Sequence, residues 1–178
     1  MPREDCSRAL TALAEAIELE KKGRAFYLDA AAKAVDPLSK STLEGLAADE
    51  MEHLRLLEAQ VETLEKTGHW ACFMDLEPKE DTYKPQTVFP GTPGLADELA
   101  NAAGGAAVVL EQAMRFEEAG YKRYKAAAAA TDDREGRAVY EYLAKQEDEH
   151  YRLLQQTHEY VLHPDRLFDD MQRPMFEG

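Results

Sequence analysis

One pattern of glutamate and histidine residues occurs twice in this chain with identical internal spacing. A glutamate is followed 30 residues later by a Glu-x-x-His sequence, and the whole set recurs 97 residues further along. The first copy consists of Glu20, Glu50 and His53, and the second of Glu117, Glu147 and His150. The flanking residues repeat with the same offset, as Gly23 and Tyr27 correspond to Gly120 and Tyr124. The repeat predicts a duplicated helical hairpin.

Turn residues lie where such hairpins require them. In two antiparallel helices, residues equidistant from the connecting turn face each other. The midpoint of the first pair of glutamates falls at Val35-Asp36-Pro37, where proline ends a helix. The midpoint of the second pair falls at Thr131-Asp132-Asp133, which offers turn and N-cap side chains. Each lone glutamate is therefore predicted to face a Glu-x-x-His pair.

The spacing within Glu-x-x-His brings both side chains to one helical face, because residues i and i+3 are neighbours there. All six residues fall on apolar stripes, where an unpaired charge would be costly. A single such motif is typical of a solvated helix face, but two matched copies indicate a metal site of four carboxylates and two imidazoles. This donor set suits iron and manganese alike.

Other residues near the motifs are predicted either to support the metal site or to lie on the surface. Tyr27 and Tyr124 each lie two turns after a lone glutamate, on the same face. Each phenol is expected to donate to a ligand carboxylate, the alternative being an ordinary core tyrosine. Gly23 and Gly120 leave room for a metal, a substrate or a close helix. The charged residues that fall off the stripes are predicted to be surface residues: Asp49, Glu52, Glu118, Asp148 and Glu149.

Composition narrows the classes of partner and compartment. A formal charge of -14 on 178 residues argues against nucleic acid and against anionic membranes. No apolar run reaches transmembrane length, and the polar Met-Pro-Arg-Glu-Asp start is unlike a signal peptide, so a cytoplasmic protein is expected. The two cysteines, Cys6 and Cys72, form no Cys-x-x-Cys pair, which excludes a rubredoxin-type centre here. Cys72 is expected to be buried beside Trp70.

The predicted organisation is a single all-α domain, a four-helix bundle of two hairpins. The first hairpin covers residues 7–66, with helices at about 7–34 and 38–66, and the second covers 95–163, with helices at about 95–130 and 133–162. Four prolines exclude a regular helix across the connection at 67–94, which is long enough to cross the bundle. A C-terminal tail follows at 164–178.

These motifs resemble those of the rubrerythrin family, within the ferritin-like superfamily. The resemblance covers both hairpins: Ala16-Ile17-x-x-Glu20-x-x-Gly23-x-x-Phe26-Tyr27, Asp49-Glu50-x-x-His53, Glu117-x-x-Gly120-x-x-x-Tyr124 and Glu147-x-x-His150. It implies a ferritin-like fold with a non-haem di-iron centre and a homodimer, in some members with exchanged hairpins. It also implies roles for the six residues: bridging for Glu50 and Glu147, terminal for Glu20 and Glu117, and capping of one iron each for His53 and His150.

Two departures from the rubrerythrin pattern affect the expected activity. No rubredoxin domain is expected, since the sequence contains no Cys-x-x-Cys pair, and Gly120 stands where those proteins carry an extra glutamate. The site is therefore expected to be more symmetric, and peroxide turnover slower. The leading expectation is two-electron reduction of hydrogen peroxide, with electrons from an external protein such as a rubredoxin. The alternatives are a ferroxidase or iron-handling protein that uses oxygen or peroxide, and a helical module with a structural metal.

Overall fold

The protein is an all-α bundle. The computed structural model describes the backbone of residues 3–76 and 95–163, and the side chains of 6–76 and 105–163. The helices are α1 (Arg3–Lys33), α2 (Pro37–Thr67), the one-turn α3 (Phe73–Leu76), α4 (Leu95–Ala130) and α5 (Arg134–Leu162). The four long helices confirm the predicted fold class, and α1 begins earlier than expected. The predicted tail and most of the predicted connection lie outside the described residues.

The turns within the hairpins form where the sequence predicts them. Asp36 caps α2 by accepting a hydrogen bond from the Ser39 backbone N–H at 2.6 Å, and Pro37 opens the helix. Asp133 caps α5 in the same way, accepting from the backbone N–H groups of residues 135 and 136. Gly68 ends α2 with a left-handed φ of 72°, a conformation that glycine adopts without strain.

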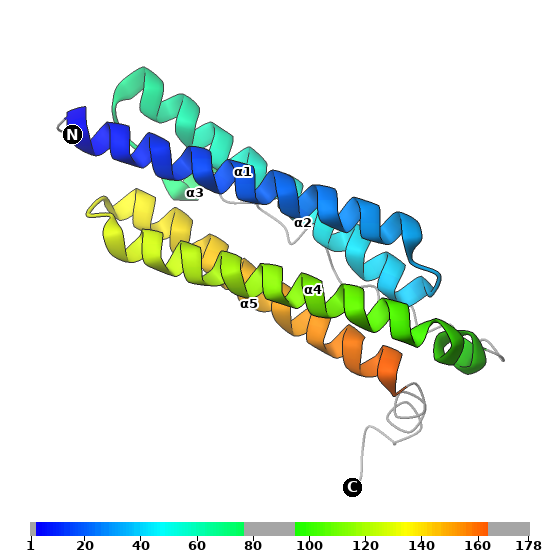
Figure 1. Cartoon of the computed structure of the whole chain (residues 1–178). Helices are drawn as coiled ribbons and strands as arrows, with labels where there is room; N and C mark the ends of the chain where they lie inside the picture. The colour runs from blue at the N-terminus through cyan, green and yellow to red at the C-terminus, as the bar shows by residue number, and fades with distance from the viewer. Residues whose placement is uncertain (1–2, 77–94, 164–178) are drawn as a thin grey trace, which may run out of the picture.

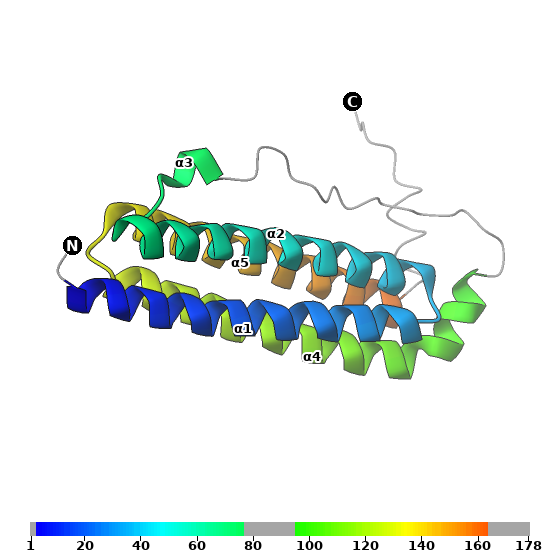
Figure 2. The same cartoon turned by 90° about the horizontal axis from the view of Figure 1, so that it is seen from above.

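The four long helices lie side by side as two antiparallel hairpins. α1 packs on α2 and α4 packs on α5, and Figure 2 shows α1 beside α4 on one face of the bundle and α2 with α5 on the other. α2 ends at the opposite end of the bundle from the start of α4 (Figure 1), as the predicted long connection requires. Of the helices in the described residues, none is long and apolar enough to cross a membrane.

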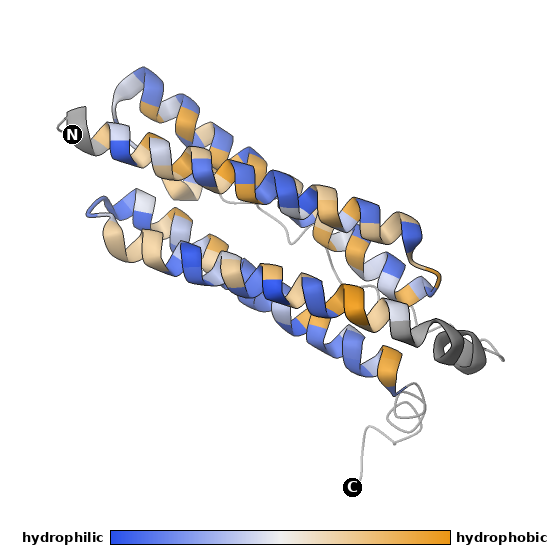
Figure 3. Ribbon diagram, viewed as in Figure 1, coloured by the Kyte–Doolittle hydropathy of each residue, from blue (hydrophilic) through white to orange (hydrophobic). Residues whose placement is uncertain are grey.

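The core consists of two apolar clusters, one toward each end of the bundle. The first is centred on Leu13, Leu57 and Leu143, and the second on Leu46, Leu110 and Leu154. Hydrophobic and hydrophilic residues are interspersed along the coloured parts of the long helices, as expected for helices with one buried face (Figure 3). The six predicted metal ligands are buried within this bundle.

The first part of the connection packs on the bundle around Trp70. The indole is buried against α5, where a Cβ added at Gly136 would stand 2.6 Å from Trp70 Cε2. Phe73 packs beside Tyr142 of the same helix. The expectation of a buried Cys72 is wrong, because its side chain is exposed. Trp70 and Phe73 supply the apolar contacts of this segment, and the thiol between them points to solvent.

Candidate metal centre

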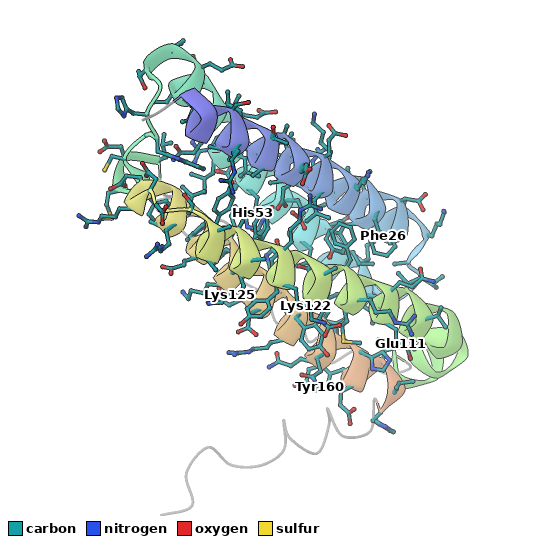
Figure 4. All side chains as sticks on the ribbon, turned by 60° about the vertical axis from the view of Figure 1, so that its left-hand side comes forward. Phe26, His53, Glu111, Lys122, Lys125 and Tyr160 are labelled. Atoms are coloured by element: carbon teal, nitrogen blue, oxygen red, sulfur yellow. The ribbon has the colours of Figure 1, made fainter. Side chains whose placement is uncertain are left out.

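All six predicted ligand residues converge in the interior of the bundle. Helix α1 contributes Glu20, α4 contributes Glu117, and each of α2 and α5 contributes one Glu-x-x-His pair. No side chain of the six residues is exposed by more than 6%, and Figure 4 shows His53 inside the bundle while Lys122 and Lys125 lie on its outside. Buried carboxylates at such density need cations or protons to offset their repulsion.

The ligand atoms form two overlapping groups. Within each group, one donor atom from every residue lies within 4.8 Å of all the others. The first group contains Glu20 and His53, the second contains Glu117 and His150, and both contain Glu50 and Glu147. Two metal positions that share two carboxylates would produce this pattern.

Both imidazoles turn the same ring nitrogen toward the carboxylates. His53 Nδ1 lies 3.2 Å from Glu20 Oε2 and 3.4 Å from Glu50 Oε2. His150 Nδ1 lies 3.5 Å from Glu117 Oε2. The two rings stack with centroids 5.5 Å apart and planes inclined by 22°. Each histidine therefore faces the glutamate that the opposite helix of its own hairpin supplies.

The two tyrosines connect the hairpins. The phenol of Tyr27 donates a hydrogen bond to Glu117, and the phenol of Tyr124 donates one to Glu20. The predicted contact with a ligand carboxylate is present, and in each case the acceptor belongs to the other hairpin. Burial, together with the nearby carboxylates, raises the pKa of both phenols well above the usual value. Both tyrosines therefore keep their protons and hold the two lone glutamates in place.

Protons offset the carboxylate repulsion when no metal is bound. Burial and the neighbouring Glu20 raise the pKa of Glu50 well above its usual range, and burial with Glu117 does the same for Glu147. Burial opposes ionisation of Glu20 and Glu117 as well, but contacts with Glu50 or Glu147, the histidine and the tyrosine outweigh it and lower both pKa values. In the metal-free site, protonation is therefore more favourable at the two shared carboxylates than at Glu20 and Glu117.

The donor set fits metal ions. Both oxygens of Glu50, Glu117 Oε2 and His150 Nδ1 are buried and have no hydrogen bond of normal geometry with the described residues. Buried polar atoms are seldom left in this condition. Carboxylate oxygens and imidazole nitrogens are suitable ligands for iron or manganese, and two ions between the overlapping groups would satisfy these atoms.

Asp49, which was predicted to be a surface residue, instead lies beside the candidate metal centre. Its Oδ2 lies 3.4 Å from His150 Nε2, and only 15% of its side chain is exposed. Asp49 precedes His53 by four residues and so shares its helical face, a signal that could have been used. In the second hairpin, the position equivalent to Asp49 is Gln146, whose side chain donates a hydrogen bond to Glu149 instead. The other four off-stripe acids, Glu52, Glu118, Asp148 and Glu149, are at least 30% exposed.

The two repeated glycines make room for the shared carboxylates. A Cβ at Gly120 would lie 2.9 Å from Glu147 Oε2. At Gly23 it would lie 3.1 Å from Glu50 Oε1 and 2.7 Å from Phe116 Cε1. All three separations are shorter than normal van der Waals contact, so the side chains of Glu50 and Glu147 occupy space that glycine leaves open.

Replacing Gly120 with alanine is expected to weaken metal binding while leaving the fold intact. The new methyl displaces the flexible Glu147 carboxylate, and alanine in a helix interior is favoured over glycine by about 1 kcal/mol. Gly105→Ala, also in α4 but with open space around it, is the matched control. Thermal unfolding of metal-free protein and competition with an iron chelator would separate the two effects. Unchanged metal affinity in Gly120→Ala would contradict this role of the glycine.

The fold and the buried donor set define a class of protein. Four helices that supply four glutamates and two histidines, with a Glu-x-x-His pair on each of two helices, are typical of dimetal carboxylate bundles. The family described as a ferritin-like domain matches residues 9–157, and the chain belongs to this family. Comparison with curated proteins and with solved structures found no match.

Proposed function

We propose that this protein is a di-iron oxidoreductase that reduces hydrogen peroxide by two electrons. The observation that carries the proposal is the pair of overlapping ligand groups with Glu50 and Glu147 in common. Two ferrous ions held there would supply one electron each, and peroxide with two protons from solvent would become two water molecules. Membership of the ferritin-like family supports a non-haem metal site of this kind.

Each residue has a role that follows from its position. Glu50 and Glu147 belong to both ligand groups and are proposed as bridges between the ions, while Glu20 and Glu117 each bind one ion. Nδ1 of His53 and of His150 completes the two positions. The phenols of Tyr27 and Tyr124 hold the terminal carboxylates and remain protonated, so they position these ligands without acting as acids.

Asp49 makes the two proposed metal positions unequal. Its carboxylate faces Nε2 of His150, and His53 has Gln146 at the equivalent place in the repeat. A histidine ligand that donates its other N–H to a carboxylate becomes a stronger base. The ion next to His150 is therefore proposed to be bound more tightly than the ion next to His53.

The electrons are proposed to come from a separate one-electron carrier, such as a rubredoxin. The two cysteines of the chain form no Cys-x-x-Cys site that could hold an iron centre of its own. A ferroxidase, in which ferrous iron is the substrate and oxygen or peroxide the oxidant, is the second candidate. The match to the ferritin-like family supports it as well as the peroxidase, because iron takes part in both functions.

Stopped-flow spectroscopy of the anaerobically reduced, iron-loaded protein tests the choice of oxidant. Peroxide is expected to oxidise the pair at least about tenfold faster than oxygen, a difference of roughly 1.4 kcal/mol in barrier. Oxidation should then stop after one turnover until a reductant is added. Comparable rates for the two oxidants, or continued oxidation of added ferrous iron beyond the bound pair, would instead support the ferroxidase.

A further inference from the structure

Three aromatic rings lie in contact between the candidate metal centre and the end of the bundle. Tyr124, whose phenol donates to Glu20, stacks on Tyr140 with centroids 6.3 Å apart and planes inclined by 23°. Tyr140 meets Trp70 edge to face, with centroids 5.7 Å apart. All three rings belong to one apolar cluster and are exposed by no more than 7%. Trp70 is the only tryptophan in the chain.

The outer end of this line reaches a hollow in the surface. Trp70 and Tyr140 contribute to the wall of a cavity of about 600 Å³ between the N-terminal half of α1 and the C-terminal end of α4. Charged side chains stand around it, including Arg8, Glu15 and Asp132. The hollow is large enough for a small organic reductant, or for an edge of a larger carrier, to approach the indole.

Among the described side chains, the corresponding tyrosine of the first hairpin does not begin a similar line of tyrosine and tryptophan rings. Tyr27 makes the same phenol–carboxylate bond, but its ring partners are Phe26 at 5.4 Å and Phe116 at 6.3 Å. Subtracting the repeat offset of 97 from Tyr140 gives Leu43. Phenylalanine and leucine are far harder to oxidise than tyrosine or tryptophan. The repeat is therefore asymmetric around the two tyrosines. Oxidisable rings continue outward from Tyr124, whereas phenylalanine rings surround Tyr27.

We propose that Trp70, Tyr140 and Tyr124 form an electron-transfer path between the surface hollow and the metal pair. This inference rests on the proposed function, because it requires redox-active metal ions in the site. A one-electron reductant at the hollow is oxidised by one electron, and one ferric ion is reduced to ferrous. Two such transfers restore the pair. The partner is thus a one-electron donor that meets the protein beside Trp70.

The rings need not exchange protons during this transfer. Tyr140 Oη and Trp70 Nε1 are buried and have no hydrogen-bond partner among the described residues. Burial also raises the pKa of Tyr140 to about 12, so the phenol keeps its proton. With no hydrogen-bond acceptor for either group among the described residues, the electron crosses in a tunnelling step through the aromatic contacts and the hydrogen bond from Tyr124 to Glu20, and no tyrosine is left oxidised.

Pulse radiolysis of the whole protein tests the path without peroxide. Azide radicals oxidise tryptophan by one electron, and Trp70 is the only target of that type. In protein loaded with ferrous iron, the total aromatic radical should vanish at least about tenfold faster than in protein loaded with redox-inert zinc. Ferric absorption should appear at the same rate. Equal decay with iron and with zinc, both shown to be bound, would overturn the path.

Substitutions on and off this line of rings test whether the electron passes through it. Tyr124→Phe and Tyr27→Phe each remove one phenol–carboxylate bond, but only the first lies on the line. Decay in Tyr140→Leu and in Tyr124→Phe is expected to slow by about tenfold, and the slowing in Tyr124→Phe should be at least about threefold larger than in Tyr27→Phe, which loses the equivalent ligand contact but no ring of the line. Equal slowing in both tyrosine-to-phenylalanine variants would also overturn the path, because it would indicate an effect on the metals alone.

The radiolysis experiment separates this inference from the proposed function. Fast radical decay in a protein whose ferrous ions do not react with peroxide would keep the path and reject the peroxidase. Rapid peroxide reduction by a protein whose radical decay does not depend on iron would support the peroxidase and reject the path. Protein that binds no iron would reject both.

Discussion

Alanine in place of Glu50 or Glu147 is expected to remove most of the bound iron. The unaltered protein should hold about two ions per chain, roughly 3.5–4 Å apart as in other two-metal sites. Each shared carboxylate belongs to both ligand groups, so its loss affects both ions. The affinity should fall by more than about 100-fold, beyond the 10–100-fold typical of residues that only support a ligand. Elemental analysis after reconstitution and gel filtration measures the loss.

The matched controls are Glu20→Ala and Glu117→Ala, which each alter one ligand group. They are expected to lose less metal than the variants of the shared residues. The helical circular dichroism of all four variants should persist, because the two apolar clusters remain intact. Two firmly bound ions in Glu50→Ala would contradict the shared ligand set. Loss of the helices on metal removal would support the structural role instead.

Metal affinity is expected to rise steeply with pH, because bound ions must displace protons. Burial, with Glu20 or Glu117, raises the pKa of Glu50 and of Glu147 well above the usual range. Burial alone would lower the pKa of His150, but Glu117 and Asp49 outweigh it and raise the pKa to about 9. The raised pKa values therefore favour the protonated forms of these groups in the metal-free protein. Raising the pH removes the protons and so favours the metal.

The size of the effect follows from the number of protons released. The pKa of His53 is also raised, because Glu20 outweighs burial, so four groups favour their protonated forms in the metal-free site. Release of two or more would increase affinity at least about 100-fold per pH unit near neutrality. Calorimetry with Mn²⁺ in buffers of different ionisation enthalpy counts the protons directly. Affinity that does not vary between about pH 6 and 8 would show that the ligands are already deprotonated.

Asp49→Asn tests how much the charge of Asp49 contributes to proton release on metal binding. The substitution removes the charge that faces His150 Nε2 and keeps nearly the same shape. Because the pKa of His150 then falls, fewer protons should be released when the metal binds. The counterpart Gln146 bonds to a surface residue, so Gln146→Ala should leave the proton count unchanged.

Much of the fold and the composition of the candidate centre followed from local rules that the sequence states directly. The identical spacing of the two motifs, with turn residues at Asp36 and Asp133, was enough to predict two hairpins and the facing of Glu20 with Glu50 and of Glu117 with Glu147. Helical periodicity and hairpin symmetry decide these relations, because both depend on distances along the chain. They hold for each hairpin separately.

The relation between the hairpins was decided only by the tertiary structure. Each tyrosine donates to the glutamate of the other hairpin, Asp49 reaches His150 on α5, and Trp70 meets Tyr140. No repeat or spacing encodes these contacts, since they depend on how two amphipathic faces slide and rotate against each other as side chains pack. The sequence by itself determined which residues could bind a metal, and packing determined which groups position them and which rings connect them to the surface.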